Sequence, residues 1–375
     1  MKSKILFLSK ENLGGTGTFL NQSLLINKNK FKINYYFFKK DVFFNFKGKP
    51  VIINKKYPSS QNPSICKLYL FFKNLFKVNF ITKNEKPDLV FACDQYSAIV
   101  VLASKMIFMQ KIPIVILVGS NLFELANDKP NRLYQLVLIQ TIKFFYNRAQ
   151  RLIFVSNDLY KGLENKLKFD TNKTSFIRNA IDINETKTIH KKSDDNNLNL
   201  ISIGRLVQPK DFETIIKAYS IINKNLPNTK LYVIGEGELK QNLEELSNKL
   251  NLSGKVIFPG WENNIFPYLA KADLFIFSSF YEGFSYVILE AMKAKVPIIA
   301  TDTPYGPSEI LDKGKYGILV PMGNYRKMAK EAEKLLKNLE LRKKYSEKAF
   351  KRAKEFDLKK MLEQYEKLFT EVINS

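Results

Sequence analysis

Two carboxylates, placed to fall in a loop and on the helix after it, are the residues best suited to chemistry. Glu282 and Glu290 lie eight positions apart, and the apolar run 274–277 before them is typical of a buried strand. Ser285 can cap a helix that begins between the two glutamates. Glu282 would then lie at the N-terminus of this helix, where backbone N–H groups point toward a bound anion. The pattern predicts that Glu282 binds sugar hydroxyls and Glu290 binds ribose hydroxyls. Two solvated glutamates on an amphipathic helix would have the same spacing.

A pair of cations, Arg205 and Lys210, follows another predicted strand at 200–203. Gly204 permits close approach of the backbone at the carboxyl edge of this strand, where open α/β sheets bind ligands. Arg205 offers a planar fork to phosphate oxygens and Lys210 offers a point charge, so the loop is suited to a diphosphate. An exposed, ion-paired loop is the alternative. Gly235 directly follows the next predicted strand, 231–234, so a glycine lies at the carboxyl end of this strand as well.

A glycine-rich loop follows the first predicted strand, 5–8. Gly14 and Gly15 lie in this loop, and an apolar helical pattern begins at Phe19. A strand, a glycine loop and a helix together let backbone amides approach a phosphate. The spacing differs from the dinucleotide-binding fingerprint, and a tight turn without a ligand remains an alternative.

Strands and helices alternate in both halves of the chain, which predicts an α/β fold with two doubly wound parallel sheets. The 375 residues, 45% of them hydrophobic, are sufficient for two cores. We expect an N-terminal domain over 1–184, a polar linker over 185–197 and a second domain over 198–355. His190, the single histidine, lies in the linker, so we expect no histidine chemistry.

The positive charge of the chain is concentrated in its first half. Residues 1–180 contain 29 Lys and Arg and 10 Asp and Glu, whereas residues 181–375 contain 31 and 26. A basic half favours an anionic membrane surface, an anionic acceptor or nucleic acid as partner, although genome composition also enriches lysine. No helix-turn-helix, zinc or RNA-binding motif is seen, so we expect no nucleic acid.

The segment 65–80 is predicted to be an aromatic helix. Its apolar residues have helical spacing, and most of them are interpreted as core: Leu68, Phe71, Phe72, Leu75 and Phe76. Three lysines of the same segment are expected to be able to face a membrane surface: Lys67, Lys73 and Lys77.

The cysteines, Cys66 and Cys93, form no close pair and no metal-binding spacing, which is typical of a reduced, cytosolic protein. The apolar residues after Met1 are too few for a signal sequence, and the apolar stretch 98–109 is too short to cross a bilayer. We therefore expect a cytoplasmic protein that is soluble or peripheral on the inner face of the membrane.

Several motifs in series resemble those of the family 4 retaining glycosyltransferases, which have the GT-B fold. The similarity in order and spacing covers residues 177–321, and the loop at Gly14 and Gly15 matches less closely. The segments that carry the resemblance are Arg178-Asn179-Ala180-Ile181-Asp182, Gly204-Arg205-Leu206 with Lys210-Asp211, Gly235-Glu236-Gly237-Glu238-Leu239, the Glu282 to Glu290 pair, the series 301–311 and Gly317-Ile318-Leu319-Val320.

The resemblance implies two Rossmann-like domains that face a central cleft, with a last helix, here 356–375, that returns to the N-terminal domain. It implies that Arg205 and Lys210 bind the diphosphate of a nucleotide sugar and that Glu282 holds the donor sugar. It further implies the roles of the remaining donor-binding residues: backbone approach at Gly204 and Gly235, amides at Gly283 and Phe284, ribose binding by Glu290, and closure over the phosphates by Gly14 and Gly15.

The expected activity is transfer of a hexose or N-acetylhexosamine from a UDP-sugar to a lipid-linked or envelope glycan, with retention at the anomeric carbon. Arg205, Lys210 and helix amides would stabilise the charge that develops on the leaving diphosphate. The sequence contains no Asp-x-Asp, which favours a site without metal or other cofactor.

The sequence departs from the family at one position. Family members often carry a histidine after the fourth strand, where this chain has Gly119-Ser120-Asn121. Ser120 and Asn121, together with Asn179, are therefore candidate sugar or acceptor contacts. A relative that binds the donor without turnover is the alternative function.

Overall fold

The computed structural model describes residues 2–10, 14–39, 46–54, 63–119, 132–184 and 197–375. The chain divides into two compact units. The first unit comprises Met1–Arg178 together with Lys359–Ser375, and the second comprises Asn179–Leu358.

These boundaries differ from the predicted ones at both ends of the second unit. The segment after Asn179 belongs to the second unit because the Ile181 amide donates to the Phe356 carbonyl at 2.9 Å and Ile181 pairs with Asp357. The last helix, α14 (Leu358–Asn374), begins two residues after the predicted start at 356. Apart from Asn197, the predicted linker lies outside the described residues, and so does His190.

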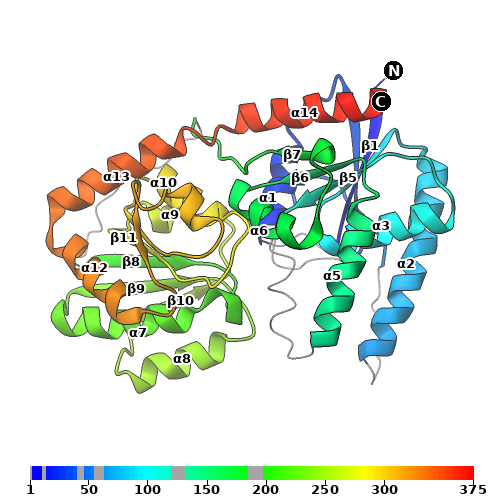
Figure 1. Cartoon of the computed structure of the whole chain (residues 1–375). Helices are drawn as coiled ribbons and strands as arrows, with labels where there is room; N and C mark the ends of the chain where they lie inside the picture. The colour runs from blue at the N-terminus through cyan, green and yellow to red at the C-terminus, as the bar shows by residue number, and fades with distance from the viewer. Residues whose placement is uncertain (1, 11–13, 40–45, 55–62, 120–131, 185–196) are drawn as a thin grey trace. The chain divides into compact units, whose positions relative to one another are not determined.

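The first unit is built on a parallel sheet of seven strands (Figure 1). The order is β3-β2-β1-β4-β5-β6-β7, so the chain starts near the middle of the sheet and builds outward in both directions. The central strands are apolar and buried, as expected where helices cover both faces. The strands are β1 (Ser3–Ser9), β2 (Phe31–Phe37), β3 (Val51–Ile52), β4 (Leu89–Ala92), β5 (Ile114–Val118), β6 (Arg151–Phe154) and β7 (Thr174–Phe176).

The α-helices in the described part of the first unit fall into two groups. Four of them pack in sequence, each against the next: α2 (Pro63–Glu85), α3 (Gln95–Ile107), α5 (Arg132–Tyr146) and α6 (Asn157–Leu167). The other two are α1 (Gly14–Ser23) and α14, which share an aromatic cluster with the central strands. The ring of Phe7 on β1 lies 6.4 Å from that of Phe19 and 6.0 Å from that of Phe369. The amide of Asn27 also donates to Glu366 at 2.9 Å, so α14 is fixed to the first unit.

The second unit has a parallel sheet of six strands in the order β10-β9-β8-β11-β12-β13. The strands are β8 (Leu198–Ile203), β9 (Thr229–Ile234), β10 (Val256–Gly260), β11 (Leu274–Phe277), β12 (Ile298–Thr301) and β13 (Ile318–Val320). The helices are α7 (Phe212–Asn225), α8 (Lys240–Lys249), α9 (Phe266–Leu269), α10 (Tyr286–Lys293), α11 (Pro307–Ile310), α12 (Tyr325–Lys337) and α13 (Leu339–Ala353). Helices α7 and α12 pack together, and their apolar faces join the sheet in one buried core.

Two doubly wound parallel α/β units confirm the predicted fold class. The carboxyl ends of β8, β9, β11 and β12 lie at one edge of the second sheet, and the loops that leave them carry most of the predicted site residues. Among the described residues, no helix has a stretch that is both long and apolar enough to cross a bilayer.

Candidate functional site

The loops after β8 and β9 are bonded to each other by their backbones. The Gly204 amide donates to the Ile234 carbonyl at 3.0 Å, and the Leu206 amide donates to the Glu236 carbonyl at 2.9 Å. Gly235 has φ +144°, and a Cβ there would lie 1.9 Å from the Gly204 carbonyl oxygen. Glycine is therefore required at 235, because no side chain fits between the two loops.

The same loop is held from the other side by the segment that follows β11. The Ser278 hydroxyl lies 2.8 Å from the carbonyl oxygens of both Lys210 and Asp211, and the Phe280 amide donates to the Pro209 carbonyl at 2.9 Å. Asp211 then begins α7, where its carboxylate accepts from the Thr214 amide. These contacts fix the backbone that carries Lys210.

Lys210 and Glu282 form an ion pair between Nζ and Oε1. Their side chains are 21% and 13% exposed, so the pair is largely protected from water but still reachable. The Ser279 hydroxyl donates to the same carboxylate oxygen at 3.1 Å. Because a lysine ammonium has three N–H donors, Lys210 can keep this contact and still donate to a further anion.

Arg205 is exposed, and within the described part of the chain no carboxylate lies within ion-pair distance of its guanidinium. Arg205 directly follows Gly204 in the loop after β8. Arg205 and Lys210 therefore belong to one loop, but only Lys210 already has an anionic partner. The planar fork of Arg205 remains available for phosphate oxygens.

The loop before α10 is packed closely against the loop after β12. Gly306 has φ +81°, and a Cβ there would lie 3.0 Å from the Cβ of Glu282 and 3.5 Å from the Gly283 carbonyl oxygen. Phe284 is buried, and its ring lies 5.5 Å from that of Phe356. Ser285 is the N-cap residue of α10 as predicted, but its side chain makes no capping hydrogen bond.

Glu290 lies on α10, where the helix is packed into the second unit. Burial raises the pKa of its carboxyl from 4.5 to about 7, and the Lys293 ammonium opposes this rise. A carboxyl with this pKa exchanges its proton near neutral pH. We detect no contact between Glu290 and the Lys210–Glu282 pair among the described residues.

The described contacts do not test the three predicted sugar or acceptor contacts. Asn179 is 8% exposed at the start of the second unit, so its side chain is largely buried. Ser120 and Asn121 lie outside the described residues. Their predicted role therefore stays a prediction.

The prediction that α1 begins at Phe19 is wrong. The helix begins at Gly14, so Gly14 and Gly15 form its first turn instead of a preceding loop. Glycine is unfavourable inside a helix, but Gly17, Phe19 and Leu20 are buried, and this packing outweighs the propensity. The first-turn amides still have no partner within the helix, so the phosphate-binding prediction is compatible with the new position.

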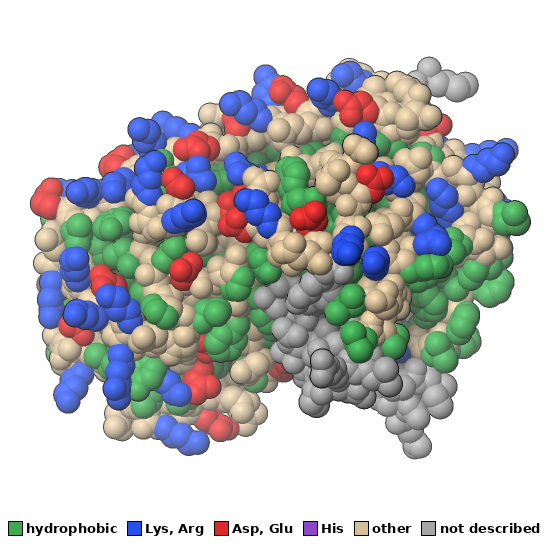
Figure 2. Space-filling view, viewed as in Figure 1, with side chains coloured by type: hydrophobic (Ala, Val, Ile, Leu, Met, Phe, Trp, Pro, Cys, Tyr) green, Lys and Arg blue, Asp and Glu red, His purple; other side chains and the backbone are tan. Residues whose placement is uncertain are grey.

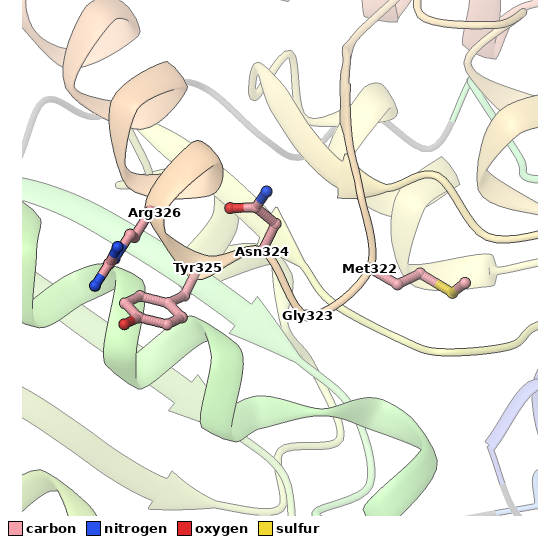
Figure 3. A pocket seen from close by; sticks show the side chains of 5 residues that line it. All are labelled: Met322, Gly323, Asn324, Tyr325 and Arg326. Carbon is pink, nitrogen blue, oxygen red and sulfur yellow. The ribbon is translucent and has the colours of Figure 1, made fainter.

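A hollow of about 390 Å³ lies at the loop between β13 and α12 (Figure 3). It is lined by Met322, Gly323, Asn324, Tyr325 and Arg326, whose labelled side chains point in different directions. None of these five residues is a predicted site residue, and the Asn324 side chain is occupied as the cap of α12. We assign no ligand to this hollow.

The sequence did not reveal the residues that support the site. Ser278 and Ser279, which directly follow β11, hold the loop of Lys210 and the carboxylate of Glu282. Thr301 continues this support, because its hydroxyl donates to the Ser279 carbonyl at 2.7 Å. Small hydroxyl residues at the ends of neighbouring parallel strands were the available signal, since such ends meet at one sheet edge.

Comparison with known proteins identifies the two units. The family of glycosyl transferases group 1 matches residues 182–352, and glycosyltransferase family 4 matches residues 41–185. An uncharacterized glycosyltransferase of Methanocaldococcus jannaschii is 30% identical over 373 residues, which cover 86% of this chain and 88% of the relative.

A second relative and a solved structure carry more specific names. The relative is the N-acetylgalactosamine-N,N'-diacetylbacillosaminyl-diphospho-undecaprenol 4-alpha-N-acetylgalactosaminyltransferase of Campylobacter jejuni, 33% identical over 219 residues, or 58% of this chain and 59% of the relative. The structure is that of Anabaena HepE in complex with UDP and glucose. It has a TM-score of 0.78 and 20% identity, and the match covers 98% of this chain and 99% of HepE.

The two parallel α/β units have the GT-B fold. The chain belongs to the group 1 glycosyltransferases, in family 4. It is therefore an enzyme that transfers glycosyl groups.

Proposed function

We propose that this glycosyltransferase transfers a hexose or N-acetylhexosamine from a UDP-sugar to a lipid-linked or envelope glycan, at the cytoplasmic face of a membrane, with retention of anomeric configuration. The observation that carries the proposal is the Lys210–Glu282 pair at the edge of the second sheet. It combines a cation for a diphosphate with a carboxylate for sugar hydroxyls, which is the pairing that a nucleotide-sugar donor requires. The name of the Campylobacter relative, which includes a diphospho-undecaprenol, and the UDP bound to HepE support the acceptor and donor classes.

In this proposal Lys210 and Arg205 stabilise the leaving group. Cleavage of the bond between sugar and phosphate places negative charge on the diphosphate oxygens, and fixed cations at that position lower the barrier. Glu282 has two roles: it holds the Lys210 ammonium in place before the donor binds, and it accepts hydrogen bonds from donor sugar hydroxyls afterwards. The contacts from Ser278 and Ser279 mean that little reorganisation is needed when the donor arrives.

Retention follows in the proposal if the acceptor hydroxyl attacks from the side of the departing diphosphate. The hydroxyl oxygen then forms the new bond to the anomeric carbon, the bond from that carbon to the phosphate oxygen breaks, and the hydroxyl proton passes to the diphosphate. Glu290 would accept hydrogen bonds from the ribose as a carboxylate, which its pKa of about 7 permits above neutral pH.

The test is a transfer assay with UDP-glucose and UDP-N-acetylglucosamine, a polyprenyl-diphosphate-linked sugar as acceptor, and proton NMR of the product. The proposal expects an α-linked product from an α-configured donor. The variant Lys210→Ala should lose transfer activity. Lys343→Ala is its matched control, because Lys343 is 63% exposed on α13 and forms an ion pair with Glu340, one turn away on the same helix. A β-linked product would refute retention. Donor binding without transfer or donor hydrolysis would instead favour the non-catalytic alternative.

A further inference from the structure

Helix α2 of the first unit has two apolar sides, and only one of them is buried. Leu70, Leu75 and Val78 face the unit and are at most 4% exposed. The opposite side carries what we call the α2 face, with exposed fractions of 50–66%: Leu68, Tyr69, Phe72, Phe76 and Phe80. Positions 69, 72, 76 and 80 recur every three or four residues and therefore lie on one side of the helix.

This result corrects the prediction that most of these residues are core. Leu75 is 2% exposed as predicted, but Leu68, Phe72 and Phe76 are 59%, 50% and 62% exposed. Apolar residues at helical spacing on both sides of one helix cannot all face the same core. A monomeric soluble protein rarely exposes a continuous apolar strip, so the α2 face marks a surface that contacts something else.

The apolar surface continues from α2 onto the end of α3. The rings of Phe76 and Phe108 lie 5.4 Å apart, and the Ser104 hydroxyl donates to the Leu75 carbonyl at 3.1 Å. Beside this contact Ile107 is 58% exposed and Met109 is 87% exposed. In Figure 2 hydrophobic side chains gather along the helix that Figure 1 labels α2. The surface therefore spans more than one element.

The charge of these helices is almost entirely positive. Together α2, α3 and α5 contain seven Lys and Arg residues and one acidic residue, Glu85. Glu85 is already occupied, since its carboxylate accepts from Lys4 at 3.3 Å and from Tyr36 at 2.9 Å. Lys67 and Lys83 are exposed on α2. The Lys77 ammonium donates to the Ile53 carbonyl at 2.6 Å, so it is already engaged within the unit, and its predicted contact with a membrane stays a prediction.

We infer that the α2 face docks the enzyme on the surface of an anionic lipid bilayer. The exposed aromatic side chains would enter the boundary between headgroups and acyl chains, while Lys83 and Lys73, whose ammonium lies 5.5 Å from the Tyr69 ring, extend toward anionic headgroups. The helix would lie in the plane of the surface, because four lysines along α2 prevent it from spanning the bilayer. A second copy of the chain is a poorer occupant, since it would bring one basic surface against another.

This inference deepens the proposed function, on which it rests for its biological reason: a lipid-linked acceptor is reached only at a membrane. Docking itself does not depend on the donor or on catalysis. Vesicle binding and sugar transfer can therefore fail separately, and an enzyme that binds vesicles but transfers no sugar would overturn only the proposed function.

The experiment is co-sedimentation of the full chain with vesicles of phosphatidylcholine alone and with vesicles that also contain phosphatidylglycerol. We expect binding to the mixed vesicles that weakens as salt is raised. The triple variant Phe72→Ser, Phe76→Ser, Phe80→Ser should lose about tenfold or more in partitioning. Its matched control replaces three apolar residues that are 44–62% exposed on other surfaces, Leu25, Met322 and Leu339, by serine and should bind as the wild type does.

A gain-of-signal variant keeps the test valid if the triple variant is unstable. Phe80→Trp places an indole on the α2 face, and Leu25→Trp places one on another exposed site of the same unit. Brominated lipids should quench the first and leave the second unchanged. Equal binding to neutral and mixed vesicles, or equal quenching at both sites, would overturn the inference. A lipid-free dimer that the triple variant dissociates would also overturn it, in favour of a second copy.

Discussion

Replacing Glu290 by glutamine should change how the stability of the enzyme depends on pH. Burial raises the pKa of Glu290 from 4.5 to about 7 in the folded protein. The unfolded chain then loses this proton at lower pH than the folded one, so ionisation favours unfolding between these two values. Stability is unaffected below about pH 4.5, falls as pH rises toward 7, and stays lower above it.

The size of this penalty follows from the difference between the two pKa values. A pKa difference between 4.5 and about 7 corresponds to roughly 3 kcal/mol in the free energy of unfolding. Glutamine keeps the shape of the side chain but carries no charge at any pH. The difference in unfolding free energy between Glu290→Gln and wild type should therefore move by ~3 kcal/mol in favour of the variant between pH 4.5 and pH 8.

The assay is urea unfolding followed by the fluorescence of Trp261, the only tryptophan, which lies in the same unit as Glu290. Glu340→Gln is the matched control, because the Glu340 side chain is 81% exposed. The difference in unfolding free energy between this variant and wild type should not change with pH as it does for Glu290→Gln. A difference for Glu290→Gln that is flat with pH, or that grows in favour of wild type, would refute the reasoning.

Three further predictions concern substitutions of single residues. Lys210→Ala should lower the rate of transfer by about 100-fold or more, because it removes a cation from the leaving diphosphate, and steady-state kinetics will show whether it does. Gly235→Ala should destabilise the second unit by more than ~2 kcal/mol, since the new Cβ would lie 1.9 Å from the Gly204 carbonyl oxygen; an unchanged urea midpoint would contradict this. Asp94→Ala should cost ~1–2 kcal/mol, because Asp94 caps α3 through the Ser97 amide, and thermal unfolding beside a Ser97→Ala variant measures it.

The sequence was sufficient to predict both sheets because their strands are continuous apolar runs. A run such as 274–277 is buried on both faces, and the helix after it follows from period and capping. The very short β3 (Val51–Ile52) carries too few residues for any period and was not predicted. The start of α1 was missed for a different reason: glycine has a low helix propensity, but the φ of +53° at Gly14 favours glycine, and the packing of Phe19 and Leu20 stabilises the helix that follows.

The site was predicted less completely than the fold. Spacing indicated that Lys210 and Glu282 each follow a strand, but it did not show that these strands, β8 and β11, are neighbours, and the ion pair depends on loop geometry that no period encodes. The α2 face was misassigned for a related reason. Periodicity reports that a residue is apolar and on which side of a helix it lies, but it does not say whether protein covers that side. Phe72 and Leu75 have the same kind of spacing and opposite exposure.

The most direct test of the donor site is calorimetric titration of UDP into wild type, Arg205→Ala and Arg326→Ala. Both arginines are exposed, but Arg205 follows β8 at the candidate site, whereas Arg326 lines the hollow beside α12. We expect UDP to bind to wild type and to Arg326→Ala with similar affinity, and Arg205→Ala to lose about tenfold or more in affinity. Unchanged affinity in Arg205→Ala, or a loss confined to Arg326→Ala, would contradict it.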